Sequence, residues 1–552
     1  MSSKLYLKDG NLALKTEYVN VSKCRKIIGG KWDKKEKAWT YPVMSAFKIL
    51  ELFDNLEIDP EAEEKIKKTE YIETQINKLK KGEIEPSQHP FLMRHQRLCR
   101  DIASLTDSFA FYLDTGTGKT LTALQIIKDN PKVKWVVICP KTIIQTAWIE
   151  DQENYYPELK LLPLSRSIKK EDYLNMAKEW EVPTNKNMSI AELQEVLAPW
   201  AQVYIINPES FRKFRQFIED NEVTGLIFDE SVKIKDHKTQ ITKDVIDFSK
   251  RLDKKYLLSG EPAPNNRMEY FTQMKVVDEG VFGSSFHKFK HAFFEPVDFH
   301  GWNWRLKPDL EEVFADRLSK KAIFIDKHDC LDLPNKTYER RYVELTGDAA
   351  KHYKQMEKER FLQIEGSVTL AQNVLTSIMK LRQITSGFVI DSYEDTQPLH
   401  KQKLNELDDV LEEIGNKQVI IWCNFKNEIR TIKDMLENKD KTVVTAYSET
   451  KNTNDSIERF KNSEVQYMLA HPQTLKYGVT LDNCSYAIYY SLSYSFDDYY
   501  QSHDRIYRKG QEKPCTFIFI LAQGTIDELI YQAIMEKKDI SEAVKSYAKG
   551  VV

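Results

Sequence analysis

A glycine-containing loop carries the residue types that bind phosphate. The sequence Asp114-Thr-Gly-Thr-Gly-Lys-Thr120 lies between the apolar run Phe109–Leu113 and the helical pattern Leu121–Lys128. In such a strand–loop–helix unit, backbone N–H groups wrap phosphate oxygens, the lysine reaches the β- and γ-phosphates, and the next hydroxyl ligates Mg²⁺. The pattern predicts a site for ATP and Mg²⁺, although Leu113 stands where the usual motif has its first glycine. The predicted nucleotide contacts are Thr115, Gly116, Thr117, Gly118, Lys119 and Thr120, and Thr120 is also a predicted metal ligand.

Two adjacent carboxylates have the chemistry that would complete an ATPase. Asp229 and Glu230 directly follow the apolar run Leu226–Phe228, so they are predicted at the carboxyl end of a strand. Asp229 can hold Mg²⁺, usually through water, and Glu230 can orient and deprotonate the attacking water. The alternative is an exposed carboxylate that caps a helix. The position of the pair after Lys119 in the chain favours the catalytic interpretation.

A third group of candidate catalytic residues lies near the C-terminus, in the segment Gln501–Gln511. Arg505 and Arg508 are expected on one helical face because their spacing is i, i+3. From a second domain, their guanidinium groups could reach the γ-phosphate as arginine fingers. The alternative, a surface helix with ion pairs, stays open for either arginine alone. The predicted catalytic residues are Lys119, Asp229, Glu230, Gln501, Arg505 and Arg508.

The elements that must position these residues are predicted from alternating apolar and helical segments. Short apolar runs separated by helical stretches are typical of buried parallel strands. A first set of runs comprises Phe109–Leu113, Trp135–Cys139, Val203–Ile206, Leu226–Phe228 and Tyr256–Leu258. A second set comprises Val419–Cys423, Thr442–Thr445, Val465–Leu469, Tyr486–Tyr490 and Thr516–Leu521. The two sets predict an α/β protein with two lobes, each a parallel sheet flanked by helices.

The rest of the chain is predicted to form a small N-terminal α+β domain and helical insertions. The segment between the two sets ends in a helical pair, Gly347–Glu365 and Val368–Ile384, followed by Lys403–Ile414. The predicted divisions are a basic N-terminal domain at 1–58, a charged helical linker at 59–88, the first lobe at 89–280, helical protrusions and an inter-lobe segment at 281–415, and the second lobe with a C-terminal helix at 416–552.

Composition and charge exclude several classes of protein. Of the 552 residues, 41% are hydrophobic and 30% are charged, which is typical of a globular rather than a disordered protein. Because no apolar run is long enough to span a membrane and no signal-peptide pattern is present, we expect a cytoplasmic protein without membrane contacts. The seven cysteines include no C-x-x-C pair, so we predict no zinc site. The net charge is −3, yet residues 1–48 hold 11 Lys or Arg against four Asp or Glu. Positive charge therefore gathers in the N-terminal domain, a candidate contact for polyanions.

The order of the motifs resembles that of the superfamily-2 helicase-like ATPases of the Swi/Snf type. The resemblance covers about residues 90–540. It rests on Leu92–Gln96, Asp114–Thr120, Val137–Lys141 with Trp148, Ile206–Ser210, Asp229–Val232, Leu258–Pro262, Ile420–Phe425, Gly478–Asp482 and Gln501–Gln511. Val232 and Glu261 depart from the family pattern, which usually has histidine and threonine at these positions.

This resemblance implies two RecA-like lobes with ATP in the cleft, and movement along duplex DNA without ordinary strand separation. It implies nucleotide contacts at Arg94, Gln96, Gly478 and Asp482, with Gln96 reading adenine. It also implies that Ser259 couples the lobes. The implied DNA contacts, mostly to backbone phosphates, are Lys141, Thr142, Ser210, Lys426 and Thr480.

The N-terminal domain contains two tryptophans among lysines. A hairpin could place Trp32 and Trp39 in one small core. In the alternative, the lysines contact phosphates while an exposed indole stacks on an unpaired base. The segment is similar to the small HARP-like domain of annealing-type, fork-remodelling ATPases, with the pattern G-x-x-W-D-x-x-x-x-x-W. The predicted DNA contacts of this domain are Lys31, Trp32, Lys34 and Lys35.

An aromatic run, Phe282–Trp304, also has two interpretations. It could line a DNA groove, or it could form the core of a helical protrusion from the first lobe. We expect the second, because several rings spaced along helices usually pack together.

These features favour an ATP-driven translocase on duplex DNA that remodels branched or forked DNA in replication, recombination or repair. We expect it to act as a monomer. The first alternative is a strand-separating DNA or RNA helicase, for which no strand-splitting hairpin is evident in the sequence. The second is a nucleotide-switched DNA-binding subunit of a defence or repair complex. The complete set of hydrolysis residues argues against that second alternative.

Overall fold

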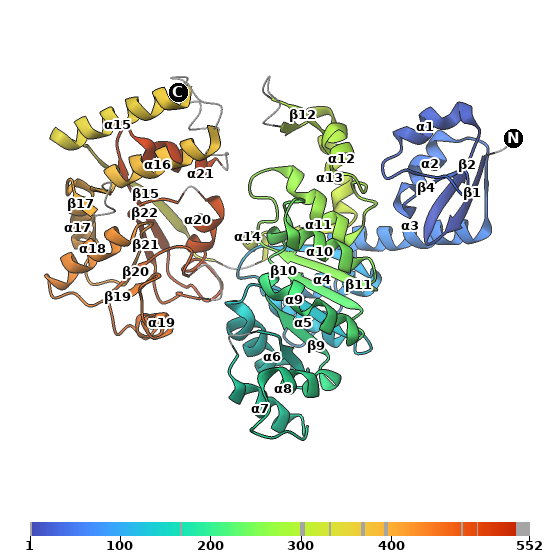
Figure 1. Cartoon of the computed structure of the whole chain (residues 1–552), viewed down its shortest axis with the longest axis horizontal. Helices are drawn as coiled ribbons and strands as arrows, with labels where there is room; N and C mark the ends of the chain where they lie inside the picture. Colours follow the sequence, from blue (N-terminus) through green and yellow to red (C-terminus); the bar gives the residue numbers. More distant parts are fainter. Residues whose placement is uncertain are drawn as a thin grey trace. The chain divides into compact units, whose positions relative to one another are not determined.

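The chain divides into two compact units, Met1–Cys330 and Leu331–Val552. The computed structural model describes residues 3–165, 168–297, 304–330, 333–365, 370–390, 396–475, 479–493 and 495–536 (Figure 1). The first unit holds the N-terminal domain, a connecting helix and the first lobe, and the second unit holds the second lobe.

The N-terminal domain is a five-stranded sheet with two short helices, which confirms the predicted small α+β domain. Its strands are β1 (Ser3–Lys8), β2 (Asn11–Lys15), β3 (Lys31–Asp33), β4 (Ala38–Tyr41) and β5 (Leu56–Ile58), in the order β3-β4-β2-β1-β5. Its helices are α1 (Val21–Lys26) and α2 (Ala46–Leu52). Leu5, Leu12, Leu14 and Ile49 are completely buried in its core. The domain therefore has a hydrophobic core of its own.

The strands β3 and β4 form the predicted tryptophan hairpin. Trp32 and Trp39 are cross-strand partners, and their ring centroids lie 5.7 Å apart in an edge-on arrangement. Trp39 packs against the core of the domain, whereas Trp32 is 48% exposed. The hairpin thus buries one indole and leaves the other accessible.

A long helix, α3 (Pro60–Lys80), leads from the N-terminal domain to the first lobe (Figure 1). Asp59 caps it by accepting a hydrogen bond from the Glu61 N–H at 3.2 Å. A proline at the first position and acidic residues in the first turn also favour a helix start here. Ala62 and Ile66 join the core of the N-terminal domain. The segment 59–88, expected as a charged helical linker, thus contains a helix that packs on the N-terminal domain.

The N-terminal domain and the end of α3 are attached to the first lobe by polar contacts. The Lys80 ammonium donates hydrogen bonds to the carbonyl oxygens of Ser319 and Ala322. The Lys31 ammonium forms a 3.0 Å ion pair with Glu279 of the first lobe. These contacts hold the basic domain against one side of the lobe.

The first lobe is built on a seven-stranded parallel sheet. Its strands are β6 (Ser108–Leu113), β7 (Trp135–Ile138), β8 (Leu161–Pro163), β9 (Val203–Ile206), β10 (Gly225–Asp229), β11 (Lys254–Ser259) and β14 (Ala322–Ile325), in the order β14-β6-β11-β10-β7-β9-β8. The first set of predicted runs is confirmed as strands. The added strands β8 and β14 are the two edges of the sheet.

Helices flank this sheet and form an insertion. They are α4 (Arg94–Leu105), α5 (Lys119–Lys128), α6 (Glu150–Tyr155), α7 (Lys170–Glu179), α8 (Ile190–Leu197), α9 (Pro208–Asp220), α10 (Gln240–Ser249), α11 (Tyr270–Val277), α12 (Phe286–Phe293), α13 (Glu311–Ser319) and α14 (Lys327–Cys330). A small antiparallel hairpin, β12 (Phe294–Pro296) with β13 (Trp304–Leu306), follows α12.

The aromatic run forms a core, as expected. Phe282, Phe289, Phe293 and Phe294 are buried and surround Phe314 of α13. Two further members of the run, Phe299 and Trp302, lie outside the described residues.

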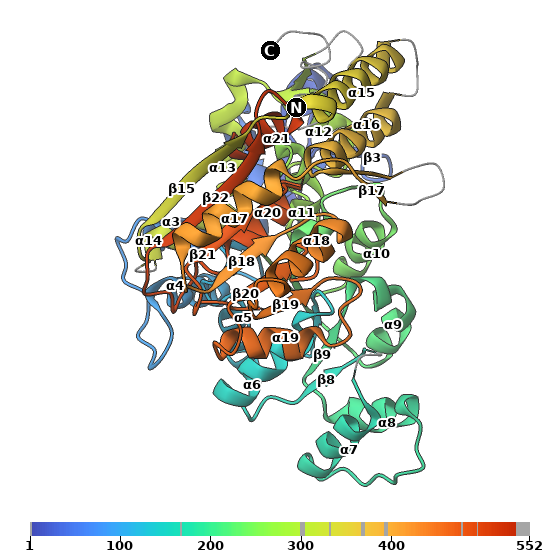
Figure 2. The ribbon, with the colours of Figure 1, turned by 90° about the vertical axis from the view of Figure 1, so that its left-hand side faces the viewer.

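The second lobe is built on a six-stranded parallel sheet. Its strands are β15 (Lys336–Val343), β18 (Val419–Trp422), β19 (Val443–Ala446), β20 (Tyr467–Ala470), β21 (Tyr486–Tyr489) and β22 (Cys515–Ala522), in the order β15-β22-β21-β18-β20-β19. The second set of predicted runs is confirmed. Figure 2 shows β15 beside β22 at the edge of the sheet. Because β15 is rich in charged residues, as edge strands often are, its sequence lacks the apolar signal of a buried strand.

Helices of the second lobe include the predicted helical pair. They are α15 (Gly347–Glu365), α16 (Leu370–Thr385), α17 (Gln402–Ile414), α18 (Lys426–Glu437), α19 (Thr453–Lys461), α20 (Phe496–His503) and α21 (Ile526–Met535), and a small hairpin joins β16 (Phe388–Ile390) to β17 (Thr396–Pro398). None of the helices within the described ranges is both long enough and apolar enough to cross a membrane.

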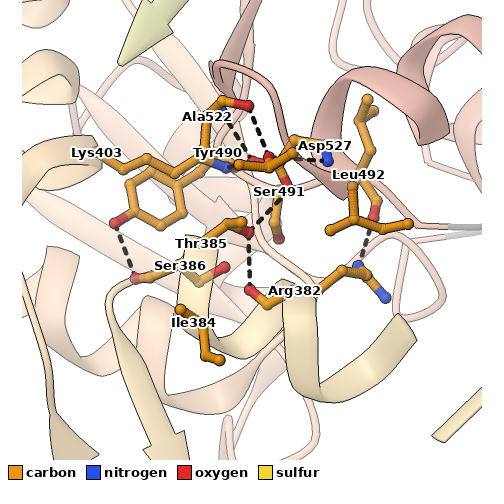
Figure 3. A network of polar contacts seen from close by, with 12 residues as sticks. Arg382, Ile384, Thr385, Ser386, Lys403, Tyr490, Ser491, Leu492, Ala522 and Asp527 are labelled. Atoms are coloured by element: carbon orange, nitrogen blue, oxygen red, sulfur yellow. Dashed lines mark hydrogen bonds and ion pairs between the residues drawn. The ribbon is translucent and has the colours of Figure 1, made fainter. Parts of the chain in front are cut away.

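A buried ion pair ties several of these helices to the sheet (Figure 3). The Lys403 ammonium of α17 lies 2.5 Å from the Asp527 carboxylate of α21, and both side chains are almost completely buried. Asp527 also accepts hydrogen bonds from the Thr385 hydroxyl and the Ala522 N–H, at 2.9 and 3.1 Å. Lys403 donates to the carbonyl oxygen of Tyr490 at 3.1 Å. The network joins α16, α17 and α21 to the segment that follows β21.

Candidate functional site

The predicted phosphate loop connects β6 to α5 in the first lobe. Gly116 and Gly118 have φ angles of 78° and 80°, a conformation that glycine adopts without steric cost. The Thr117 hydroxyl donates to the Asp114 carbonyl oxygen at 2.7 Å and closes the turn. A left-handed residue immediately before a helix directs backbone N–H groups outward, as a phosphate site requires.

Two side chains of α4 form hydrogen bonds with carbonyl oxygens of the phosphate loop. His95 Nε2 lies 2.8 Å from the carbonyl oxygen of Thr117. The Gln96 amide nitrogen donates to the carbonyl oxygens of Thr117 and Gly118, at 3.3 and 3.2 Å, and its oxygen accepts the Met93 N–H. Gln96 therefore positions the loop here, and its contact with adenine stays a prediction.

Arg94 lies on the outside of the same helix. Its guanidinium donates to both carboxylate oxygens of Glu85 at 3.1–3.2 Å, in an exposed ion pair. A contact of Arg94 with nucleotide would have to replace this pair, and it stays a prediction.

Asp229 ends β10 in a buried position beside the loop. The Trp148 indole N–H donates to one of its oxygens at 3.1 Å, and the Glu230 N–H donates to the other at 3.0 Å. Burial raises the pKa of Asp229, while the nearby positive charge of Lys119 opposes that rise. The Lys119 ammonium itself donates to the Leu113 carbonyl oxygen at 3.2 Å. A buried carboxylate facing an ammonium group is a favourable place for a divalent cation with phosphate.

Glu230 is also buried, with 7% of its surface exposed. It has a φ of 58°, and its side chain makes no capping hydrogen bond to the short turn Ser231–Ile234 that follows. The alternative of an exposed helix cap is therefore wrong for this carboxylate. Non-glycine residues in this strained conformation are often found at functional sites.

The end of β11 approaches the phosphate loop from another strand. A Cβ on Gly260 would lie 3.2 Å from Thr115 Cγ2 and 3.6 Å from Lys119 Nζ, so a small residue keeps this side open. Ser259 is completely buried, and its hydroxyl has no hydrogen-bond partner within the described part of the chain. A buried polar group without a partner at this position fits a site that receives a polar ligand.

Sequence reasoning missed Gln273, which links three segments of the site. Its amide oxygen accepts hydrogen bonds from the hydroxyls of Ser231 and Tyr112, at 2.7 and 3.2 Å. Its amide nitrogen donates to the Pro262 carbonyl oxygen at 2.7 Å. No motif surrounds Gln273, so only the packing of α11 against the sheet reveals this role. It connects the segment after Glu230 with the loop after β11.

The donor set of this region fits a magnesium nucleotide. Thr120 is the second residue of α5, and the buried Asp229 carboxylate provides an oxygen ligand of the kind that Mg²⁺ prefers. Across the described ranges, no group of three or more His, Cys, Asp or Glu side chains is placed to hold a metal ion. Mg²⁺ would therefore depend on the nucleotide phosphates and water for most of its ligands.

The arginine segment of the second lobe does not have the predicted helical geometry. The helix α20 ends at His503, so Arg505 and Arg508 follow it in a turn and do not share a helical face. In the turn, the Arg505 carbonyl oxygen accepts the Leu481 N–H at 2.9 Å. Both guanidinium groups instead reach the Val479 carbonyl oxygen, Arg505 at 2.8 Å and Arg508 at 3.5 Å.

Gln501 holds Arg505 in a buried position. The Arg505 guanidinium donates to the carbonyl oxygen and the amide oxygen of Gln501, at 2.8 and 3.2 Å. Asp482 lies close to this segment, since a Cβ on Gly510 would come within 2.6 Å of its carboxylate. Gly478 lies outside the described residues. The roles of these residues toward nucleotide stay predictions.

The candidate DNA contacts of the first lobe follow two neighbouring strands. Lys141 and Thr142 are exposed after β7, and Ser210 is partly exposed in the first turn of α9 after β9. Since β7 and β9 are paired in parallel, these residues share the carboxyl edge of the sheet. Their contact with DNA stays a prediction.

The two candidate DNA contacts of the second lobe differ in their surroundings. Lys426 begins α18 and forms an exposed ion pair with Glu449 at 3.2 Å. Thr480 is partly exposed. An exposed pair of this type is weak and can exchange for a phosphate.

The candidate DNA contacts of the N-terminal domain lie on the β3–β4 hairpin. Lys34 and Lys35 are exposed in the turn, next to the half-exposed Trp32 ring. Lys31 differs, because it pairs with Glu279 of the first lobe. The predicted DNA-contacting lysines are therefore of two kinds. Lys34 and Lys35 lie in an exposed turn, whereas Lys31 forms an ion pair with the first lobe.

Two family models match the chain. Residues 111–387 match the SNF2-related domain, and residues 402–510 match the helicase conserved C-terminal domain. The first match contains Lys119, Asp229 and Glu230, and the second contains Arg505 and Arg508.

Known proteins are similar over most of the chain. Protein p41 of Acyrthosiphon pisum secondary endosymbiont phage 1 is 23% identical, over 78% of this chain and 91% of its own length. A Caenorhabditis elegans protein is 22% identical over 77% of this chain. Its name is SWI/SNF-related matrix-associated actin-dependent regulator of chromatin subfamily A-like protein 1 homolog. The DNA repair and recombination protein RAD54-like of Gallus gallus is 22% identical over 78% of this chain. The chain spans only 58% of the C. elegans protein and 63% of the G. gallus protein.

A solved structure is also similar. The Sulfolobus solfataricus SWI2/SNF2 ATPase core in complex with dsDNA is 21% identical and covers 85% of this chain and 95% of its own, with a TM-score of 0.37.

Proposed function

The chain belongs to the Swi/Snf-type family of superfamily-2 helicase-like ATPases and is a DNA-dependent ATPase, and we propose that it moves along duplex DNA and remodels branched or forked DNA. The observation that carries the proposal is a basic N-terminal domain that lies against an ATPase lobe, where Gly280 of the lobe packs close to Pro42 of the domain and Lys31 forms an exposed ion pair with Glu279. A DNA-binding domain attached to the ATPase lobe would move along DNA together with that lobe.

The first-lobe site supplies the groups needed for hydrolysis. In this proposal, N–H groups of the loop from Thr115 to Gly118 bind phosphate oxygens, and Lys119 neutralises their charge. Thr120 and Asp229 hold Mg²⁺, which neutralises charge on the transferred phosphate when it is bound. Glu230 orients the attacking water and accepts its proton.

The hairpin of the N-terminal domain suits a junction between single and double strands. The half-exposed Trp32 ring offers a stacking face for an unpaired base, which is worth about 1–3 kcal/mol. Lys34 and Lys35 beside it can contact phosphates without reading sequence. Such a surface favours a fork over a blunt duplex, because only the fork presents an unpaired base next to a duplex end.

The test is ATP hydrolysis by the full chain with no DNA, single strands, blunt duplex or a fork, at fixed salt. We expect stimulation by duplex and greater stimulation by the fork. The variant Trp32→Ala/Lys34→Gln/Lys35→Gln should lose the extra stimulation by the fork and keep that by blunt duplex. The matched control, Lys65→Gln/Lys68→Gln on the exposed face of α3, should behave as wild type.

Each other outcome contradicts part of the proposal. Stimulation by single strands or RNA alone would indicate the strand-separating helicase. Hydrolysis unaffected by any nucleic acid would contradict the translocase. Equal stimulation by fork and blunt duplex would remove the fork preference and leave the translocase on duplex DNA.

A further inference from the structure

A basic hollow lies on the first lobe, outside the sheet edge that carries the predicted motif contacts. Its volume is about 260 Å³, and its lining includes three lysines, one carboxylate and three rings: Lys243, Lys250, Lys275, Asp247, His237, Phe271 and Phe286. The segment before α10, the helix α10, the helix α11 and the start of α12 supply these residues. Figure 1 shows α10 and α11 side by side in the first lobe.

The lysines of the hollow outnumber the carboxylate that lines it, Asp247. Lys243 is exposed, and no hydrogen bond or ion pair engages its ammonium group in the part of the chain that the structure describes. Lys250 has one contact with Asp247, at 3.4 Å, but that carboxylate also pairs with Arg215 at 2.8 Å. The Lys275 ammonium donates only to the Ser284 carbonyl oxygen, at 2.7 Å. The cluster therefore carries an excess of positive charge.

Mutual repulsion accompanies this excess. Burial lowers the pKa of the Lys275 ammonium, Glu279 opposes the shift, and the positive charges of Lys250 and Lys31 add to it. An anion in the hollow would relieve the repulsion among these groups. Lys31, which belongs to the N-terminal domain, also acts on Lys275, although Glu279 pairs with Lys31 at 3.0 Å.

The apolar part of the hollow is aromatic. The His237 ring stacks on Phe286 with centroids 3.9 Å apart, and Phe271 meets Phe286 edge-on at 5.4 Å. Phe286 is partly exposed, unlike the buried rings of the same aromatic run. Aromatic rings among lysines suit the sugar and base edges of a nucleic-acid strand whose phosphates contact the ammonium groups.

We propose that the basic hollow binds the sugar–phosphate backbone of DNA and extends the DNA path from the first lobe toward the N-terminal domain. Ser284 lines both this hollow and a second one, of about 230 Å³, that Lys31 and Thr40 of the N-terminal domain help to form. The two hollows are therefore neighbours. Lysines, which act as flexible point charges, suit backbone contacts that do not depend on sequence. The inference rests on the DNA function proposed above.

The test is the salt dependence of duplex binding by the full chain and by Lys243→Gln/Lys250→Gln. Both side chains are exposed, so the variant should fold. Each lost phosphate contact reduces the slope of log K against log salt by about 0.9, so we expect a decrease of up to about 1.8. This corresponds to binding up to about 60-fold weaker at 0.1 M salt if the affinities converge at 1 M. The matched control is Lys169→Gln/Lys178→Gln at α7, which lies well away from α10 in both views and should keep the wild-type slope (Figures 1 and 2).

A second measurement uses the unaltered protein. An amine-reactive reagent followed by mass spectrometry should show that duplex DNA protects Lys243 and Lys250 and leaves Lys169 and Lys178 reactive. An unchanged slope with full reactivity of Lys243 and Lys250 would overturn the inference while DNA-stimulated hydrolysis stays intact. Protection by ATP without DNA would assign the hollow to a mononucleotide and would also overturn it. Protection by duplex without stimulated hydrolysis would support the hollow and contradict the translocase.

Discussion

The buried pair of Lys403 and Asp527 should be the most sensitive electrostatic contact of the second lobe. Both groups are nearly inaccessible to water, and removing one partner leaves the other charge buried. Such a loss costs about 3–5 kcal/mol. We therefore expect Lys403→Met and Asp527→Asn each to destabilise the lobe by that amount.

The double variant Lys403→Met/Asp527→Leu should be much less damaging than the sum of single variants. It contains no buried charge, and the main remaining cost is the Ala522 N–H, which loses its acceptor. A buried donor without a partner costs about 1–3 kcal/mol. The difference between the double variant and the sum should thus exceed about 3 kcal/mol.

Hydrogen exchange of amides in β21 and β22, followed by mass spectrometry on the full chain, measures these changes. A loss of about 3 kcal/mol makes exchange through opening roughly 150-fold faster, since 1.4 kcal/mol is a factor of ten. The matched control is Lys439→Met, which breaks an exposed pair with Asp408 in the same lobe and should cost less than about 1 kcal/mol. Additive losses in the double variant, or single variants no worse than Lys439→Met, would refute the reasoning.

Three further predictions concern the first unit. Glu230→Gln should abolish ATP turnover and keep ATP binding, because only the base for water is lost; turnover near that of wild type would exclude its assigned role. Gly118→Ala should weaken ATP binding at least tenfold in a folded protein, because φ is 80° and the new Cβ would lie 2.2 Å from the Gln96 amide nitrogen. Filter binding measures the affinity for ATP, and an unchanged affinity would contradict this prediction. Gly280→Ala should loosen the contact between the N-terminal domain and the first lobe, because the new Cβ would lie 2.6 Å from Pro42. Faster proteolysis at residues 81–88 would report this loosening, whereas cleavage at the wild-type rate would show that the contact adapts to the added methyl group.

Local pattern predicted the central strands and the edge strand β19, but it missed the edge strands β8, β14 and β15. The run Val203–Ile206 is a strand with the predicted bounds, because a central parallel strand is apolar on both faces. The strand β15 was not predicted, because its edge position permits the charged sequence Lys336–Val343. The helix Gly347–Glu365 has the predicted bounds, since its period is visible in the sequence.

The sequence likewise predicted one part of the candidate site correctly and another part wrongly. The turn of the phosphate loop at Gly116 and Gly118 could be predicted, because positive φ requires glycine at the position itself. The helical placement of Arg505 and Arg508 was wrong, because α20 ends at His503 and the Arg505 carbonyl oxygen bonds instead to Leu481, a residue distant in the sequence.

Residue order and local composition were sufficient for the family, the two parallel sheets and the turn of the phosphate loop, since these depend on neighbours along the chain. The role of Gln273, the pairing of Lys31 with Glu279 and the gathering of Lys243, Lys250 and Lys275 around one hollow were not accessible in this way. Each of them joins segments that are distant in the chain. Their contacts exist only after packing has brought those segments together, so no local pattern records them.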